Sequence, residues 1–271
     1  MLEIIFLLTI GLVWIIFASI QDLKNREVAN WLSFSLIIFA VGFRFFWSLF
    51  SEDFMFFYQG LIGLAIFLAI GNLFYYSRLF AGGDAKLMIA LGPVLGFYSN
   101  FYTNLKIYLL FLIIFLFAGA FYGLVWSFFI CLRNFKNFKR EFSKQFARHR
   151  KIIFYVLILA LIVMALGFLE ELIFYFGVLV FITPYLYIYA KAVDEACMIK
   201  KVKTKELVEG DWLYKDVKIG KKLIKAKWEG LSKEEIRILK KSKKQILIRN
   251  GIAFVPVFLI AFIVLIFAWL F

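Results

Sequence analysis

Two aspartates are the residues of this chain whose type and surroundings favour chemistry. Asp22 closes the first long hydrophobic stretch, and Asp84 follows two glycines at the start of a short apolar one. An acidic side chain at membrane depth costs a few kcal/mol, so it marks a functional site by default. Two carboxylates about 3 Å apart do not both ionise readily, so one can take a proton from water while the other donates to a carbonyl oxygen. We interpret Asp22 and Asp84 as such a pair, suited to hydrolysis of a peptide bond.

The neighbours of Asp84 fit this interpretation. Gly82 and Gly83 permit backbone conformations closed to other residues and let a substrate strand approach the main chain. Lys86 is expected either to anchor the cytoplasmic side or to tune the pair. Each aspartate also has a structural alternative, with Asp84 as the N-cap of a helix from Ala85 and Asp22 as a solvated charge at a helix end. The occurrence of both acids on one membrane face favours catalysis.

Other catalytic groups are poorly represented. His149 lies between Arg148 and Arg150, and we expect it on a solvated surface. Cys131 and Cys197 are far apart in the sequence, so they suggest neither a disulfide framework nor a metal-binding Cys-x-x-Cys pair. We therefore expect no metal and no cofactor.

The composition predicts an all-α polytopic membrane protein. Hydrophobic residues make up 64% of the 271 positions, and charged residues only 18%. Because a spanning helix needs about 20 apolar residues, we expect about eight spans. They are residues 2–21, 31–50, 57–77, 85–98, 105–131, 152–169, 172–190 and 251–271. The fourth is too short to cross unaided, so it must meet thinned membrane or water, or be shielded by protein.

The positive charges predict the orientation. The net charge is +14, and lysine and arginine gather in residues 132–151 and 191–250. Loops of this kind remain cytoplasmic and attract anionic lipid head groups, so membrane lipids are expected partners and nucleic acid is not. This assignment puts Asp22 and Asp84 on the cytoplasmic side of the cell membrane. Arg44 and Lys106 are expected near the outer interface, where their side chains can snorkel.

The predicted domains follow from these segments. Residues 191–250 are expected to form a small α+β cytoplasmic appendage, with a helix starting at the capping box Ser232-Lys233-Glu234-Glu235 and a strand over Gln245 to Arg249. The full division is 1–131 as a transmembrane aspartic peptidase core, 132–151 as a basic cytoplasmic loop, 152–190 as a transmembrane hairpin, 191–250 as the appendage and 251–271 as a C-terminal transmembrane helix.

Two motifs resemble those of a known family. Gln21-Asp22 followed by Ala29-Asn30, and Gly82-Gly83-Asp84-Ala85-Lys86-Leu87, resemble the aspartic prepilin peptidases, most closely the archaeal preflagellin and prepilin-like signal peptidases. The second motif is similar to the family's G-x-G-D-x-K-L. The resemblance implies a six-helix-type core in which Asp22 and Asp84 are catalytic, and Gly82, Gly83, Lys86 and Asn30 support them. Two positions depart from the pattern, since Ala81 replaces the first glycine and Ala29 replaces the usual proline.

The same resemblance implies a substrate. Such enzymes remove a short basic class III signal peptide from type IV pilin-like precursors, namely archaellins or prepilins, at the cytoplasmic membrane face. Glu27, Glu209 and Asp211 are candidate contacts for that basic leader.

Other functions stay open at this point. A presenilin-like intramembrane protease shares G-x-G-D but has a tyrosine before its first aspartate, where this chain has Gln21. A proton-coupled transporter could use the two acids as a relay, yet the spans offer little polarity toward the outer face beyond Arg44 and Asn72. A non-catalytic membrane scaffold would tolerate loss of either aspartate.

Overall fold

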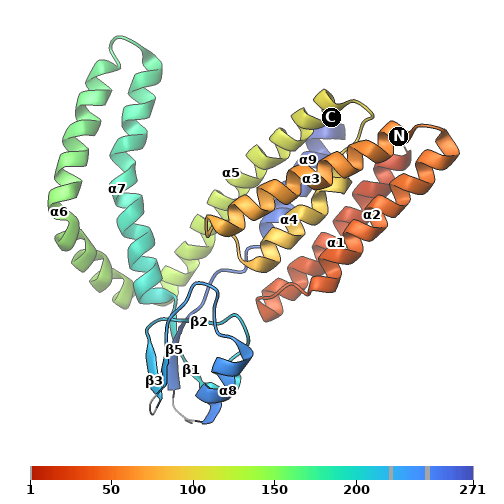
Figure 1. The fold of residues 1–271 in the computed structure, drawn as a ribbon. Coiled ribbons are helices and arrows are strands. Elements are labelled where there is room, and N and C mark those ends of the chain that lie inside the picture. The colour runs from red at the N-terminus through yellow and green to blue at the C-terminus, as the bar shows by residue number, and fades with distance from the viewer. Residues whose placement is uncertain (1, 220–221, 242–244, 271) are drawn as a thin grey trace. The chain divides into compact units, whose positions relative to one another are not determined.

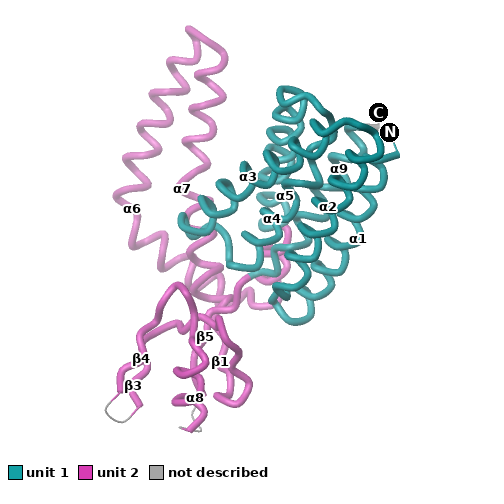
Figure 2. The backbone as a smooth tube through the Cα atoms, turned by 45° about the vertical axis from the view of Figure 1, so that its right-hand side comes forward, with its two compact units in different colours: residues 1–124, 252–271 teal, residues 125–251 magenta. Residues whose placement is uncertain are grey.

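The computed structural model describes residues 2–219, 222–241 and 245–270. Two compact units divide the chain, Met1–Leu124 with Ile252–Phe271 as unit 1 and Val125–Gly251 as unit 2 (Figure 2). The helices among the described residues are α1 (Leu2–Asn25), α2 (Asn30–Ser51), α3 (Phe54–Tyr76), α4 (Gly82–Leu95), α5 (Phe101–Arg133), α6 (Phe135–Leu166), α7 (Glu171–Cys197), α8 (Lys233–Lys241) and α9 (Pro256–Leu270) (Figure 1).

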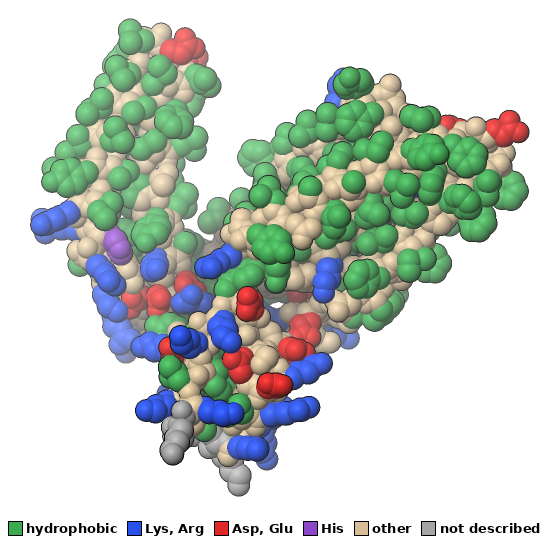
Figure 3. Space-filling view, in the orientation of Figure 1, with side chains coloured by type: hydrophobic (Ala, Val, Ile, Leu, Met, Phe, Trp, Pro, Cys, Tyr) green, Lys and Arg blue, Asp and Glu red, His purple; other side chains and the backbone are tan. Residues whose placement is uncertain are grey.

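The lengths and composition of the helices indicate a multi-pass membrane protein. Six described helices are long and apolar enough to cross a membrane, namely α1, α2, α3, α5, α6 and α7. Hydrophobic side chains cover much of the surface of the helices in Figure 3. The helices α4 and α9 have only 14 and 15 residues, so the expected count of eight spans is not confirmed. The last predicted span, 251–271, is helical only from Pro256, which takes the first helical position, where its missing N–H costs nothing.

The short helix α4 lies at the centre of unit 1. Its side chains from Leu87 to Leu95 are almost all buried, and it packs against α1, α2 and α3. Gly63 of α3 and Gly92 of α4 let the two backbones touch, because a Cβ atom built on either would lie 2.4 Å from the carbonyl oxygen of the other. Protein therefore shields α4, one of the arrangements that its length requires.

Arg44 of α2 does not lie at the outer interface, so that prediction is wrong. Its side chain is fully buried. Nε donates to the Pro93 carbonyl oxygen at 2.6 Å, Nη1 donates to that of Phe56 at 2.8 Å, and Nη2 donates to that of Gly96. The last carbonyls of a helix have no partner within the helix, and the planar guanidinium can serve several at once. Arg44 thus closes the C-terminal end of α4.

In unit 2, the basic segment 132–151 is helical rather than a loop. It forms the end of α5 and the first half of α6, where Phe138 and Phe142 are four residues apart and their rings lie 5.7 Å from each other. This spacing places both rings on one helix face, which favours an amphipathic helix over a loop. His149 is half-buried, with its ring 5.7 Å from that of Tyr187, and not fully solvated as expected. The expected break between two apolar segments is confirmed, because α6 ends at Leu166 and α7 begins at Glu171.

The appendage of unit 2 is the predicted small α+β fold. Strand β5 (Gln245–Arg249) is central and pairs antiparallel with β1 (Ile199–Lys203) and β2 (Trp212–Leu213). The 3₁₀ turn η1 (Thr204–Glu206) follows β1, and β3 (Val217–Ile219) pairs with β4 (Lys222–Ile224) in a hairpin. The capping box is confirmed, since Glu235 Oε2 accepts from the Ser232 N–H at 3.0 Å and Ser232 Oγ accepts from the Glu235 N–H at 3.3 Å.

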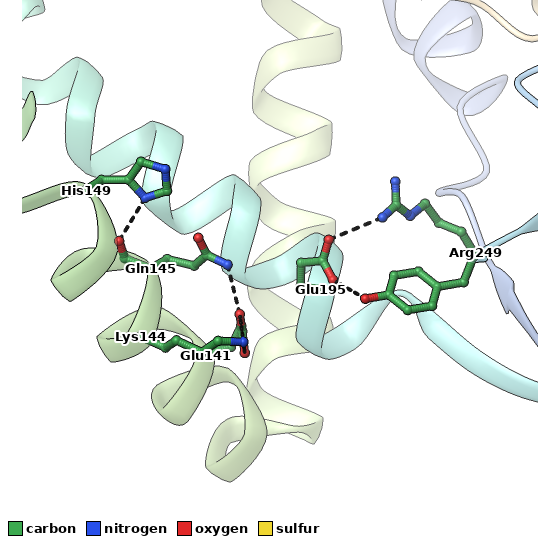
Figure 4. Close-up of polar contacts among 7 residues, drawn as sticks. Glu141, Lys144, Gln145, His149, Glu195 and Arg249 are labelled. Atoms are coloured by element: carbon green, nitrogen blue, oxygen red, sulfur yellow. Dashed lines mark hydrogen bonds and ion pairs between the residues drawn. The ribbon is translucent and has the colours of Figure 1, made fainter. Parts of the chain in front are cut away.

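A polar network joins the appendage to the end of α7 within unit 2. Arg249 of β5 forms ion pairs with Asp194 at 3.2 Å and with Glu195 at 3.4 Å. The Tyr214 hydroxyl donates to the second Glu195 oxygen at 2.7 Å (Figure 4). Several partly exposed contacts therefore order the last turn of α7 and the sheet together.

Candidate active site

Asp22 lies in the last turn of α1 and is buried, with 6% of its surface exposed. Its Oδ2 accepts a hydrogen bond of 2.9 Å from the main-chain N–H of Val255, the residue before α9. The structural alternative of a solvated charge at a helix end is therefore wrong for this residue. A carboxylate out of water needs such donors, because an uncompensated buried charge is costly.

Asp84 lies in the first turn of α4 rather than before the helix. The helix begins at Gly82 and its N-cap residue is Ala81, so the expectation that Asp84 is the N-cap is wrong. The Asp84 Oδ2 instead accepts from the Ala81 N–H at 3.2 Å, as an acid at the third helical position commonly does. The side chain is partly exposed, and the positive end of the helix dipole favours negative charge there.

The structure brings the two predicted acids together. The carboxyl groups of Asp22 and Asp84 lie close enough to repel each other electrostatically when both are charged. They come from different helices, and the pairing of α1 with α4 inside unit 1 creates this proximity. Two like charges that share a site do not both ionise easily. A pair of this kind can supply one proton donor and one proton acceptor.

The motif residues around Asp84 differ in how specific their contacts are. Lys86 Nζ donates to Asn30 Oδ1 at 2.7 Å, which ties α4 to the first residue of α2. A Cβ atom on Gly83 would lie 3.4 Å from the Val28 Cβ atom, an ordinary contact distance, so Gly83 packs against the α1–α2 turn without being required there by space. At Gly82 the nearest atom would be 3.9 Å away, and nothing in the packing requires glycine there.

The position that departs from the motif is tolerated by the backbone. Ala81 has φ −72° and ψ 164°, an extended conformation that any residue adopts. Replacement of the first glycine by alanine therefore introduces no backbone strain.

The turn that follows Asp22 is also ordered by local bonds. Gln21 Oε1 accepts from the Ala29 N–H at 2.9 Å, and the Asp22 carbonyl accepts from the Arg26 N–H at 2.8 Å. Arg26 takes the left-handed conformation at φ 59° to reverse the chain. These contacts fix the direction in which α1 ends, and hence the place of Asp22.

The candidate leader contacts lie in two places. Glu27 is exposed in the α1–α2 turn, close to Asp22 in sequence and in unit 1. Glu209 and Asp211 lie in unit 2, where Glu209 pairs with Lys233 at 3.4 Å and Asp211 accepts from the Val208 N–H at 2.9 Å. Burial raises the pKa of Asp211 above its usual value, more than its backbone hydrogen bond lowers it. Asp211 thus holds a turn, and Glu209 is an exposed acid.

Sequence reasoning missed Val255 and misplaced Arg44. The contribution of Val255 is a main-chain N–H, which any residue except proline would supply, so no sequence signal identifies it. For Arg44 the signal was a single cation inside a hydrophobic stretch, and its buried carbonyl partners come from residues distant in sequence.

Comparison with known proteins identifies the class of this part of the chain. Residues 9–128, which include both aspartates, match the model of the type IV leader peptidase family. The resemblance indicated by the two motifs is thereby confirmed for this segment. The relatives found are archaeal proteins named preflagellin peptidase.

The similarity covers a limited part of each protein. The preflagellin peptidase of Methanocaldococcus jannaschii is 30% identical over 90 residues, which are 33% of this chain and 38% of that protein. That of Methanococcus maripaludis is 30% identical over 86 residues, which are 32% of this chain and 37% of that protein. That of Methanococcus voltae is 28% identical over 90 residues, which are 33% of this chain and 38% of that protein. The chain thus spans well under half the length of these curated relatives, and no solved structure matches it significantly.

Proposed function

We propose that this protein is a membrane-embedded aspartic endopeptidase. Its substrates would be type IV pilin-like precursors, archaellins or prepilins, from which it removes the short basic class III signal peptide. The observation that carries the proposal is the close approach of Asp22 and Asp84 inside the segment that matches the leader peptidase family. The name of the relatives, preflagellin peptidase, supports a precursor of this kind.

The geometry supports a two-carboxylate hydrolysis. The ionised carboxylate takes a proton from water as the water oxygen bonds to the scissile carbonyl carbon, and the neutral carboxyl gives its proton to the carbonyl oxygen. When the carbon–nitrogen bond then breaks, the newly protonated carboxyl gives its proton to the leaving amine. The other carboxylate recovers a proton from the tetrahedral hydroxyl, so the pair returns to its starting state. Gly82, Gly83, Lys86 and Asn30 would hold the two acids in place.

The same proposal assigns an orientation. The basic residues of 132–151 and 191–250 would keep these segments in the cytoplasm, and Asp22 and Asp84 would face the same side of the cell membrane. Lysine and arginine side chains are prominent on the appendage in Figure 3. Glu27, Glu209 and Asp211 would then be available to the basic leader. The predicted domain division remains a proposal with one change. The last helix is assigned to the peptidase core, because it belongs to unit 1.

The alternative functions fit the contacts less well. A proton-coupled transporter would need a polar route from the aspartates toward the outer face, and the spans offered little for it beyond Arg44 and Asn72. The Arg44 guanidinium instead donates to three carbonyls and is fully buried. The presenilin-like protease and the scaffold gain no support from the relatives found.

The test is cleavage of a defined precursor. Purified protein in lipid nanodiscs would be incubated with an archaellin-like precursor, and the mass of the product would be measured. We expect one cut on the leader side of the hydrophobic helix, and a precursor with its basic leader residues replaced by glutamine serves as the matched control. Failure to cut archaellin-like and prepilin-like precursors under conditions where the protein remains folded would overturn the proposal.

A further inference from the structure

The segment that leads into α9 contacts Asp22, although it lies outside the family match of residues 9–128. The Val255 N–H donates to Asp22 Oδ2 at 2.9 Å, across 233 positions of sequence. Both residues belong to unit 1. The contact is therefore a tertiary feature of the peptidase core, and a main-chain group supplies it.

Packing fixes this donor in place. Val255 is fully buried. The preceding Phe254 ring lies 6.1 Å from that of Phe80, just before α4, and 5.9 Å from that of Phe115 in α5. Pro256 follows and restricts the conformation of Val255 through its ring. The N–H can therefore not turn away from Asp22 without disturbing three helices.

The two acids differ in how they are hydrogen bonded. Asp22 has a 2.9 Å bond from a fully buried donor, whereas Asp84 has a 3.2 Å bond from Ala81, which is exposed to solvent. Hydrogen bonds to a charged group are strongest where water is excluded. The bond from Val255 favours the ionised form of Asp22 more than the bond from Ala81 favours that of Asp84.

Charged and titratable groups from several elements lie within electrostatic reach of Asp22. Arg26, in the turn after α1, attracts its negative charge. Asp84 from α4 repels it, and Tyr122 from α5 lies within electrostatic reach of it. The sequence of α9 contains no titratable side chain, and Arg44 of α2 is bonded at the opposite end of α4. The main-chain N–H groups of Val255 and Phe254, together with Arg26, thus stabilise charge on Asp22.

We propose that Val255 is a positioning residue whose main-chain N–H holds Asp22 as the ionised member of the pair. Asp22 is then the base that takes the proton from water, and Asp84 is the acid that donates to the carbonyl oxygen. This inference rests on the proposed function, because it assigns the roles within that reaction. It also makes the segment of unit 1 just before α9 part of the catalytic centre.

The first test needs no substrate. Cell-free synthesis would replace the Val255 amide by an ester, using α-hydroxyisovaleric acid, which removes the N–H and keeps the side chain. Val264, in the interior of α9, is the matched control, since its ester removes an ordinary helical N–H from the same residue type. The ionisation of Asp22 would be followed by the infrared band of its protonated carboxyl, assigned as the band lost in Asp22→Asn. We expect the Val255 ester to move the pH at which half of this band is lost by about one unit to higher pH. The Val264 ester should leave that pH unchanged.

The second test uses cleavage and separates this inference from the proposed function. The acid limb of the kcat/KM profile should move to higher pH by about the same amount in the Val255 ester. Val255→Pro removes the same N–H by ordinary mutagenesis and should move the limb in the same direction. The inference is overturned, and the function stands, if the wild type cleaves the precursor but the Val255 ester changes neither the acid limb of the kcat/KM profile nor the infrared titration of Asp22. If no precursor is cleaved, the function fails, and the infrared midpoint alone decides which acid carries the charge.

Discussion

Charged side chains lie at the two ends of α4 in contrasting surroundings. At the C-terminal end, Arg44 donates to three main-chain carbonyls, from Pro93, Gly96 and Phe56, and is fully buried. At the N-terminal end, Asp84 accepts one weak bond from Ala81 and lies against a second carboxylate. A charge with all its partners stabilises a structure, whereas two like charges that share few donors are poised to exchange protons. We infer that one end of the helix anchors it and the other carries the chemistry.

The largest effect is expected at the anchoring end. Arg44→Met should leave several buried carbonyls without donors, at a cost of about 1–3 kcal/mol each. We expect a lower melting temperature in detergent and little folded protein, measured by intrinsic fluorescence during heating. Lys106→Met is the matched control, because Lys106 is exposed and its loss should change stability little. A folded and stable Arg44→Met variant that has lost only cleavage would contradict the claim that the C-terminal end of α4 anchors the helix.

The second largest effect on stability is expected where α3 and α4 lie in close contact. Gly92→Ala would place a Cβ atom 2.4 Å from the Gly63 carbonyl oxygen, so the helices must separate, at a cost of about 1–3 kcal/mol or more. Gly42→Ala in α2 is the control, since its Cβ atom would meet nothing within 4 Å and should stabilise the helix slightly. The melting temperatures of the two variants should therefore move in opposite directions. Equal stability of the two variants would contradict the packing described for α4.

A smaller effect is expected at the bond between α4 and α2. Lys86→Met removes the 2.7 Å bond to Asn30, which lies at the surface and should contribute less than about 1 kcal/mol to stability. Because the bond orients the first turn of α4, we expect a several-fold loss of kcat with an unchanged melting temperature. Asn30→Ala should give the same loss, and the double variant should lose no more than either single one. Additive losses would show that Lys86 acts independently of Asn30.

The smallest effect is expected in the appendage and depends on pH. The Ser232 N–H donates to Glu235, and this bond lowers the pKa of the Glu235 carboxyl below its usual value. A carboxyl whose pKa is lower in the folded state adds stability above its ordinary pKa, and this stability is lost as the pH falls toward the folded value. We expect faster hydrogen exchange of α8 amides in the full-length protein near pH 4 than at pH 7, after correction for intrinsic rates. In Glu235→Gln, the difference in corrected exchange rate between pH 4 and pH 7 should be smaller. If that difference is unchanged, the Glu235 carboxyl is not its cause.

The sequence was informative where local pattern decides structure. The capping box at Ser232 and the strand from Gln245 are confirmed, because side chains adjacent in sequence determine both. The two aspartates could be paired from their motifs and from the topology of the charges. The bond from Val255 to Asp22 and the burial of Arg44 could not be predicted from the sequence. Each depends on main-chain groups that elements distant in sequence bring together. The expected loop at 132–151 failed because its positive charges were given more weight than the helical spacing of Phe138 and Phe142.

The most direct measurement of the central claim is precursor cleavage by Asp22→Asn and Asp84→Asn in nanodiscs. Asparagine is nearly isosteric and can still accept the main-chain bonds, but it cannot transfer the proton. Asp53→Asn is the control, because Asp53 accepts from the Met55 N–H at the start of α3 and asparagine can cap that helix as well. We expect each active-site variant to fold, to melt at or above the wild-type temperature, and to lose cleavage by at least about a hundredfold, as removal of an acid or base does. Cleavage at the wild-type rate by either variant would contradict the catalytic pair.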